Sequence, residues 1–353
     1  MRRDESPLKI ILRQRFYFVF EVIIVFFGIF IFMLFPSILL PSLIDTKSPL
    51  FEPLYYYLRA VILVVMIPIL LYLANLIMEK QRRKLVLKED ISPSNNFLNL
   101  FKITKKNFKF QLLYGMLLLF LIFIPLDFFT YLFLPEMLSY SSVILFFGYN
   151  SYFFENFSIF SLSIIFIPLF VAINEESLTR GFLTNRGCDY FNRMSAVILS
   201  SFFFGLGHFS YIFTRPSLDL PIIFPTIWFI QTFLVGIILA MVVLRRHWIF
   251  PAIFAHTLNN VISSFSIWNH INGKEFSFMA IYVYLPLLIV GIILFIWQFS
   301  RIKESLSIGF REFRTYFERD KKIDERLRDV IFRIIMDLLF GLIIFLIGIA
   351  TVF

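Results

Sequence analysis

Nine mostly apolar stretches, each near twenty residues long, dominate this sequence and leave only short polar segments between them. A transmembrane helix needs about 20 consecutive apolar residues, whereas a soluble domain is only about 45–50% apolar. Here 59% of the 353 residues are hydrophobic. We therefore predict an all-α fold, a polytopic transmembrane helical bundle with about eight to nine spans. The predicted spans lie near 17–40, 60–78, 112–134, 157–183, 194–212, 222–244, 249–268, 277–298 and 330–352.

The positive charges are distributed unevenly between the two sides of this predicted bundle. Of the 33 Lys and Arg residues, 29 fall in five segments that the predicted topology places on one side, at 1–16, 79–111, 180–193, 245–246 and 299–333. Cytoplasmic loops of membrane proteins carry such an excess. We therefore expect a plasma (inner) membrane protein with a cytoplasmic N-terminus. Basic loops beside a membrane predict contact with membrane lipids and not with nucleic acid.

The chain divides into three predicted parts. Residues 1–156 hold the N-terminal spans and the basic cytoplasmic loop 79–111, residues 157–268 hold a helical core with the motifs described below, and residues 269–353 hold the C-terminal spans. The single cysteine excludes an intrachain disulfide and a metal cluster built from cysteines.

The cytoplasmic segment 299–329 is amphipathic. Ile302, Leu306, Phe310, Phe313 and Phe317 follow one another at intervals of four, four, three and four residues, with charged residues between them. This spacing forms one apolar stripe on a helix. Two interpretations stay open at this point: a helix that lies in the bilayer interface, or a solvated connecting helix packed on the protein.

Three short strings place ionisable and amide side chains inside the predicted spans. Ionisable groups are costly in hydrocarbon, so they mark by default a functional site that faces the bundle interior. Taken one at a time, each string is also explained by structural ion pairs or by hydrogen bonds between helices. Together they favour one site. The strings are Glu175-Glu176-Ser-Leu-Thr-Arg180-Gly181, Phe204-Gly-Leu-Gly-His208 and His256-Thr-Leu-Asn-Asn260.

The spacing within the strings predicts how the side chains are directed. Glu176 and Arg180 are four residues apart, so they share a helix face and can form an ion pair. Glu175 lies about 100° around the helix from Glu176 and points in another direction, where it suits a general base. His256 and Asn260 are also four apart and can donate hydrogen bonds toward one point.

The residues around His208 predict how that ring is held. Phe204 lies one turn earlier and can fix the ring by packing. Gly205 and Gly207 remove side chains beside it, which would let a neighbouring helix approach closely.

Other catalytic motifs are absent from the sequence. It has no His-Glu-x-x-His zinc pair and no Gly-x-Ser-x-Gly turn for a nucleophilic serine. It also lacks a Gly-x-Gly-Asp partner for an aspartyl dyad. Glu21, Asp127 and Asp337 lie in predicted spans but match no motif, so we predict structural roles for them.

The order Glu-Glu-x-x-x-Arg, Phe-x-x-x-His, His-x-x-x-Asn resembles the CPBP (Abi) family of intramembrane proteases. That family includes the type II CAAX prenyl endopeptidases and proteins linked to bacteriocin processing and self-immunity. The resemblance covers about residues 157–268 and includes Gly181. Family members often carry an aromatic residue just before the arginine, where this chain has Thr179.

The resemblance implies an intramembrane endopeptidase that hydrolyses peptide bonds of membrane-embedded or lipidated substrates. Glu175 and His208 would hold and deprotonate a water molecule, which attacks the scissile carbonyl. His256 and Asn260 would stabilise the developing oxyanion. Three further residues would support this catalytic group: Glu176, Arg180 and Phe204.

Two questions stay open in this interpretation. We expect no cofactor, but Glu175, His208 and His256 are a candidate set of zinc ligands, and such enzymes have been described both as metal-dependent and as metal-free. The second hypothesis for function is a non-catalytic protein on the same fold, serving bacteriocin self-immunity or scaffolding a partner in the membrane.

Overall fold

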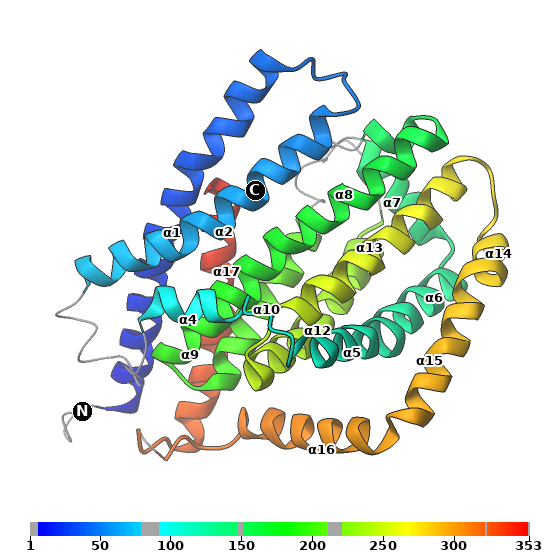
Figure 1. Ribbon diagram of the computed structural model, residues 1–353. Coiled ribbons are helices and arrows are strands. Elements are labelled where there is room, and N and C mark those ends of the chain that lie inside the picture. The colour runs from blue at the N-terminus through cyan, green and yellow to red at the C-terminus, as the bar shows by residue number, and fades with distance from the viewer. Residues whose placement is uncertain (1–5, 79–91, 147–150, 211–220, 322, 352–353) are drawn as a thin grey trace.

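The computed structural model of the protein describes residues 6–78, 92–146, 151–210, 221–321 and 323–351. These residues form helices and contain no strand, which confirms the predicted all-α fold (Figure 1). The α-helices are α1 (Pro7–Leu43), α2 (Phe51–Ile77), α4 (Pro93–Asn99), α5 (Phe108–Leu118), α6 (Ile124–Phe133), α7 (Glu136–Phe146), α8 (Phe157–Glu176), α9 (Asn185–Tyr190), α10 (Arg193–Phe209), α12 (Ile223–Arg246), α13 (Phe250–Ile271), α14 (Phe276–Met279), α15 (Leu285–Trp297), α16 (Phe299–Thr315) and α17 (Leu327–Thr351). Three π-helical segments, η1 (Leu119–Phe123), η3 (Ser177–Thr184) and η4 (Ala280–Tyr284), and the 3-10 segment η2 (Ser151–Phe154) complete the order.

Seven helical stretches among the described residues are long and apolar enough to cross a membrane, which confirms a polytopic helical membrane protein. The other two predicted spans, 194–212 and 249–268, are helices as well, α10 and α13. α10 has only 17 described residues, and α13 buries a series of polar side chains that lowers its apolarity. Both carry a polar string, whereas the third string lies in a stretch, Phe157–Tyr190, that does qualify as a candidate span.

The first helix is longer than predicted. α1 begins at Pro7 and not near residue 17. The basic residues before residue 17 argued against a span there, but Arg15 is buried and its Nη2 atom lies 2.7 Å from Asp337 Oδ1 of α17. A buried partner lowers the cost of the charge, so the helix continues through it.

The packing order places α10 in the interior of the bundle. α10 packs against α12, α17 and η3, while α8 packs against α2 and α13. Figure 1 shows α8 and α13 running side by side through the middle of the molecule, with α5 on the far side of α13. This arrangement brings the three helices with polar strings to one part of the bundle.

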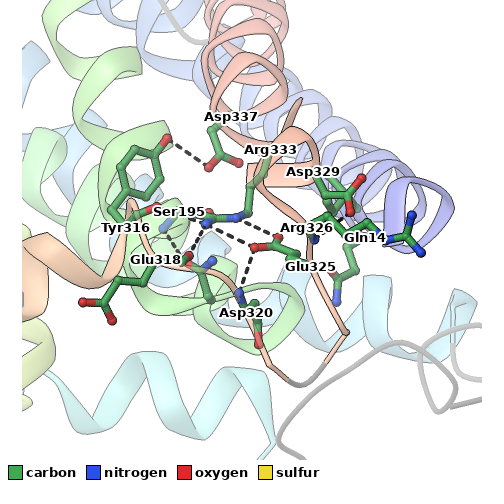
Figure 2. A network of polar contacts seen from close by, with 12 residues as sticks. Gln14, Ser195, Tyr316, Glu318, Asp320, Glu325, Arg326, Asp329, Arg333 and Asp337 are labelled. Atoms are coloured by element: carbon green, nitrogen blue, oxygen red, sulfur yellow. Dashed lines mark hydrogen bonds and ion pairs between the residues drawn. The ribbon is translucent and has the colours of Figure 1, made fainter. Parts of the chain in front are cut away.

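Basic segments gather at one end of the bundle. Arg15 donates from Nη2 to Ser195 Oγ over 3.2 Å, and the start of α17 and the segment after α16 form a polar network beside it (Figure 2). Arg193 Nη1 lies 3.6 Å from Glu312 Oε1, and Arg245 Nη2 lies 3.6 Å from a carboxylate oxygen of α16. Four of the five basic segments are thus neighbours, as predicted. In the fifth, 79–111, residues 79–91 lie outside the described residues, and which side of the membrane this end faces stays a prediction.

Three carboxylates in predicted spans match no motif: Glu21, Asp127 and Asp337. Each of them bonds to another side chain of the protein. Glu21 accepts hydrogen bonds from Arg186 Nε and Nη2 over 2.6 and 2.8 Å. Asp127 accepts one from Ser263 Oγ, and Asp337 pairs with Arg15. These contacts agree with the structural roles predicted for them.

Candidate active site

The three strings lie on helical elements that pack against one another. Glu175 and Glu176 are the last two residues of α8, and Arg180 follows in η3. His208 lies in the last turn of α10. His256 lies in α13, in its second turn.

Glu176 is the central acceptor of a buried ion-pair group. Its Oε1 atom accepts from Arg180 Nη1 over 3.0 Å and lies 2.8 Å from Nδ1 of His256. Glu176 is fully buried and Arg180 is 1% exposed. The predicted i, i+4 pair is therefore confirmed, and it extends to a second helix because Glu176 also holds the His256 ring.

Glu175 approaches the same histidine from the other side. Its Oε2 atom lies 3.5 Å from Nε2 of His256. Glu175 and Glu176 point in different directions, as predicted, and both reach the ring of His256. The two nitrogens of one imidazole ring lie far enough apart for both carboxylates to reach it.

His208 is oriented by the backbone of its own helix. Its Nδ1 atom lies 3.1 Å from the carbonyl oxygen of Phe204, which can only accept a hydrogen bond. The hydrogen is therefore assigned to Nδ1, which leaves Nε2 of the neutral ring as an acceptor. The Glu175 carboxylate is near enough to His208 to interact with it electrostatically.

Phe204 packs between the charged members of the site. Its ring centroid lies 4.3 Å from the Arg180 guanidinium carbon, 4.9 Å from the His208 ring and 6.2 Å from the His256 ring. A cation over a ring face is stabilised by the ring quadrupole. Phe204 therefore supports Arg180 and fixes the space between the two histidines.

Asn260 takes a less defined position. It is half-buried one turn beyond His256 on the same face of α13. Within the described part of the chain its side chain makes no hydrogen bond, whereas the neighbouring Asn259 interacts with Asp127. The structure thus brings Glu175, Glu176, Arg180, Phe204, His208 and His256 together, and it sets Asn260 beside them along α13.

Two irregular helical segments border the site. η3 carries Arg180, and η1 carries Phe123, whose ring is stacked 6.1 Å from the ring of His256. In η3, Thr179 Oγ1 donates to the carbonyl oxygen of Glu175 over 2.5 Å and accepts from Arg180 Nη1 over 2.8 Å. Such side-chain bonds compete with the backbone ladder, and π-helical turns are frequent at functional sites.

Several contacts at the site were not predicted from the sequence. Thr179 was noted only as a departure from the family pattern, yet it links Glu175 to Arg180. Ser200 Oγ of α10 donates to the Thr179 carbonyl oxygen over 2.8 Å. The Trp228 ring of α12 lies 6.0 Å from the ring of His208. Phe123, Ser200 and Trp228 come from outside the three strings and match no motif.

The two glycines before His208 differ in their surroundings. A Cβ atom on Gly205 would lie 3.0 Å from the Phe229 ring and 3.1 Å from the Phe229 carbonyl oxygen. The predicted close approach of a neighbouring helix is therefore confirmed there, with α12 as the neighbour. At Gly207, no atom of the described residues lies within 4 Å of such a Cβ, so no close approach is seen there among them.

The candidate zinc ligands do not form a metal-binding group as they are arranged. Among the described residues, no three His, Cys, Asp or Glu side chains are grouped so that they could hold a metal ion. Nδ1 of His256 bonds to Glu176 and Nδ1 of His208 to the Phe204 carbonyl, so Nε2 is the nitrogen that each ring has available. The reaction steps proposed below are written for the side chains of this protein alone.

The fold and this site define a polytopic membrane protein with carboxylates, an arginine and two histidines clustered within its helices. Residues 157–262 match a family model described as type II CAAX prenyl endopeptidase Rce1-like. This segment, somewhat less than a third of the chain, contains all three strings, so the resemblance to the CAAX-protease-like family predicted from them is confirmed. Searches of the curated proteins and of the solved structures found no match.

Proposed function

We propose that this protein is an intramembrane endopeptidase that uses Glu175 and His208 to activate a water molecule. The observation that carries the proposal is that one oxygen atom of the Glu175 carboxylate lacks a hydrogen-bond partner. Its Oε2 atom is buried and has no hydrogen-bond partner among the described residues, although the side chain as a whole is 29% exposed. A buried polar atom without a partner is rare in native structures and calls for an explanation such as a missing water or a catalytic role.

In the first step, the water lies between Glu175 Oε2 and Nε2 of His208. It donates one hydrogen bond to each acceptor, which orients a lone pair on its oxygen away from both. As the oxygen attacks the scissile carbonyl carbon, one water proton passes to Glu175. A base within hydrogen-bond reach of the water contributes about 10²–10⁴-fold to such a step.

The second step stabilises the negative charge that develops on the carbonyl oxygen. His256 donates from Nδ1 to Glu176, and with hydrogen on both nitrogens it also donates from Nε2 to the oxyanion. Asn260, on the same face of α13, would donate its amide hydrogen to the same oxygen. Such donors are effective because they are fixed in place where water is scarce.

In the third step, the tetrahedral intermediate breaks its C–N bond. Glu175, now protonated, returns its proton to the leaving amine, which regenerates the carboxylate and yields a free acid and a free amine. Glu176 and Arg180 take no proton in this scheme, because each is held by the other. We propose membrane-embedded or lipidated peptides as substrates, since the site lies inside a bundle that is apolar on its outer surface.

The test compares the wild-type protein with Glu175→Gln, purified in lipid, on a pool of labelled membrane-bound peptides. Glutamine keeps the size and one acceptor oxygen but cannot take the proton, so cleavage should fall at least about 100-fold. Glu155→Gln is a matched control, because Glu155 is an exposed carboxylate just before α8 begins. Equal cleavage by Glu175→Gln and wild type would exclude the proposed base.

The same pair of variants separates the enzyme from the non-catalytic alternative. If the cellular role is immunity or scaffolding, the phenotype should survive Glu175→Gln at a normal protein level. If the role depends on peptide hydrolysis, the phenotype should disappear together with cleavage.

A further inference from the structure

α16 connects two membrane-spanning helices at the surface of the bundle. α15 ends at Trp297, which is 68% exposed, and α16 begins two residues later at Phe299. The stretch that contains α15 and the helix α17 are both candidate spans. Figure 1 shows α16 lying across the end of the bundle and not continuing the direction of α15. Both of its ends are therefore held at the level where spans leave the membrane.

The surface of α16 is divided into three sides. Successive residues turn by about 100°, so Phe299, Leu306 and Phe310 fall within about 20° of one line along the helix. Phe317, two residues past the end of α16 at Thr315, falls on the same line if the helical turn is continued. These four residues, the exposed stripe, are 51%, 53%, 72% and 55% exposed. The exposed stripe is narrower than the one predicted from the sequence, because Phe313 packs on the protein core.

A second side of α16 is fixed to the protein. Phe313 packs beside the buried Tyr316, whose hydroxyl donates to Asp337 Oδ2 over 3.2 Å, and Arg333 Nη2 donates to the Tyr316 carbonyl oxygen over 3.0 Å (Figure 2). Glu312 and Glu304 pair with arginines of the bundle. These contacts prevent the helix from turning, so the exposed stripe keeps one direction. α16 therefore packs on the protein, as one of the two sequence interpretations predicted, and it also presents an exposed apolar stripe.

The third side is charged, and cations border the exposed stripe. Lys303 and Arg314 lie about 40–60° from its centre line, and Arg311 lies further round. All three are exposed. Long cationic side chains keep their stems on apolar surface while their charged ends reach the headgroup layer.

We propose that α16 is an interfacial helix whose exposed stripe is inserted in the surface of the same bilayer, with anionic lipid headgroups against Lys303 and Arg314. An apolar stripe held at the membrane surface and bordered by cations is the pattern of helices that lie in the interface of anionic membranes. A second copy of the chain is a poorer partner, because its own α16 would bring the same cations against these. The proposal does not depend on the proposed peptidase activity.

The experiment uses the full chain in lipid nanodiscs that contain one copy each, in a Cys188→Ser background. A polarity-sensitive fluorophore is attached at Phe310→Cys or at Thr315→Cys. Thr315 is an exposed residue of the same helix and lies about 140° around it from Phe310. The readouts are quenching by iodide in the water and by nitroxide-bearing lipids. The thermal unfolding midpoint of each variant checks that the fold is kept.

For an interfacial helix, the label at 310 should be quenched by the lipid nitroxide and should be several-fold less sensitive to iodide than the label at 315. This difference should grow when anionic lipid replaces zwitterionic lipid, and it should shrink in Lys303→Glu/Arg314→Glu. Equal iodide quenching at both positions would overturn the proposal. Protection of position 310 only in discs with two copies would overturn it as well, because another chain would then cover the exposed stripe. A difference that ignores lipid charge would refute the part assigned to anionic headgroups.

Discussion

Buried carboxylates in this bundle are of two kinds, which differ in how their oxygen atoms are used. Glu21, Asp337 and Glu325 belong to the first kind, and in each of them both oxygens accept hydrogen bonds. Asp337 accepts from Arg15 on Oδ1 and from Tyr316 on Oδ2, while Glu325 accepts from Arg333 on both oxygens. Each oxygen of these three carboxylates therefore has a hydrogen-bond partner, although Nη1 of Arg333 has none among the described residues.

Glu175 and Glu176 belong to the second kind. The Oε2 atom of each is buried without a hydrogen-bond partner among the described residues, and so is Nη2 of Arg180. Leaving a buried polar atom unpaired costs about 1–3 kcal/mol, and more when the group is charged. The comparison teaches that Glu21, Asp337 and Glu325 are satisfied on both oxygens, whereas both carboxylates of the motif keep one oxygen without a partner. Outside the motif, Glu52 Oε2 and Asp329 Oδ1 are also buried without a hydrogen-bond partner among the described residues. The free oxygens of the motif carboxylates are what a bound water or substrate would use.

The largest expected effect follows directly from this difference. Glu175→Gln should lower turnover by about 10²–10⁴-fold, equivalent to about 2.7–5.5 kcal/mol in the barrier, with little change in the thermal unfolding midpoint. His208→Ala should act similarly, and the double variant should be no worse than the stronger single one, because both act on one water. Independent losses that multiply would show that the two residues do not share a step.

The second prediction concerns the first kind of carboxylate. Asp337→Asn removes the charge that Arg15 faces in the interior, and breaking such a buried pair costs about 3–5 kcal/mol of stability. We expect a lower yield and a lower unfolding midpoint, while turnover per folded molecule stays close to wild type. Glu318→Gln is the control, because Glu318 is 59% exposed and its ion pair with Arg314 is worth at most about 1 kcal/mol. If turnover per folded molecule fell in Asp337→Asn but not in Glu318→Gln, the division between structural carboxylates and carboxylates of the site would be wrong.

Glu176→Gln should share features of both cases. The glutamine keeps an acceptor oxygen for one partner, but Arg180 and His256 now compete for it without a full charge. We expect a stability loss of about 3–5 kcal/mol, as for the other buried ion pair, and a fall in turnover because His256 is held less firmly. The unfolding midpoint and the cleavage rate should be measured on the same preparation. A fall in turnover without loss of stability would move Glu176 into the same role as Glu175.

The sequence predicted the pairings within one helix better than those between helices. The period of the α-helix alone predicted the Glu176–Arg180 pair and the shared face of His256 and Asn260, because residues four apart are neighbours in any helix. It could not predict that Glu176 reaches His256, because that contact depends on how α8 and α13 pack. For the same reason the contacts of Phe123 and Trp228 with the two histidines carried no signal in the sequence.

The distribution of Lys and Arg predicted which segments lie together at one end of the bundle, but it misplaced the start of the first helix. Counting Lys and Arg correctly grouped the basic segments that meet at one end of the bundle. The same charges hid the start of α1, because a buried Arg15 is only explained by Asp337, more than 300 residues later in the chain. The sequence showed that Thr179 stands where family members often have an aromatic residue, but it did not predict the bonds of Thr179 to Glu175 and Arg180. A hydroxyl that bonds to the backbone leaves no periodic pattern in a sequence.

The smallest predicted effect tests whether the second kind of carboxylate is also positioned by its surroundings. Thr179→Val removes the hydroxyl that donates to the Glu175 carbonyl oxygen and accepts from Arg180, at a cost of about 0.5–1.5 kcal/mol for each hydrogen bond lost. Thr184→Val is the matched control in the same π-helical segment, because Thr184 is fully buried and its hydroxyl has no partner among the described residues. Replacing that hydroxyl with a methyl group should be neutral or slightly stabilising. If Thr179 positions the site, Thr179→Val should lower turnover several-fold more than its small change in unfolding midpoint accounts for, and Thr179→Ser should restore most of the loss. Equal behaviour of the two valine variants would mean that the hydroxyl of Thr179 contributes nothing to the geometry of Glu175.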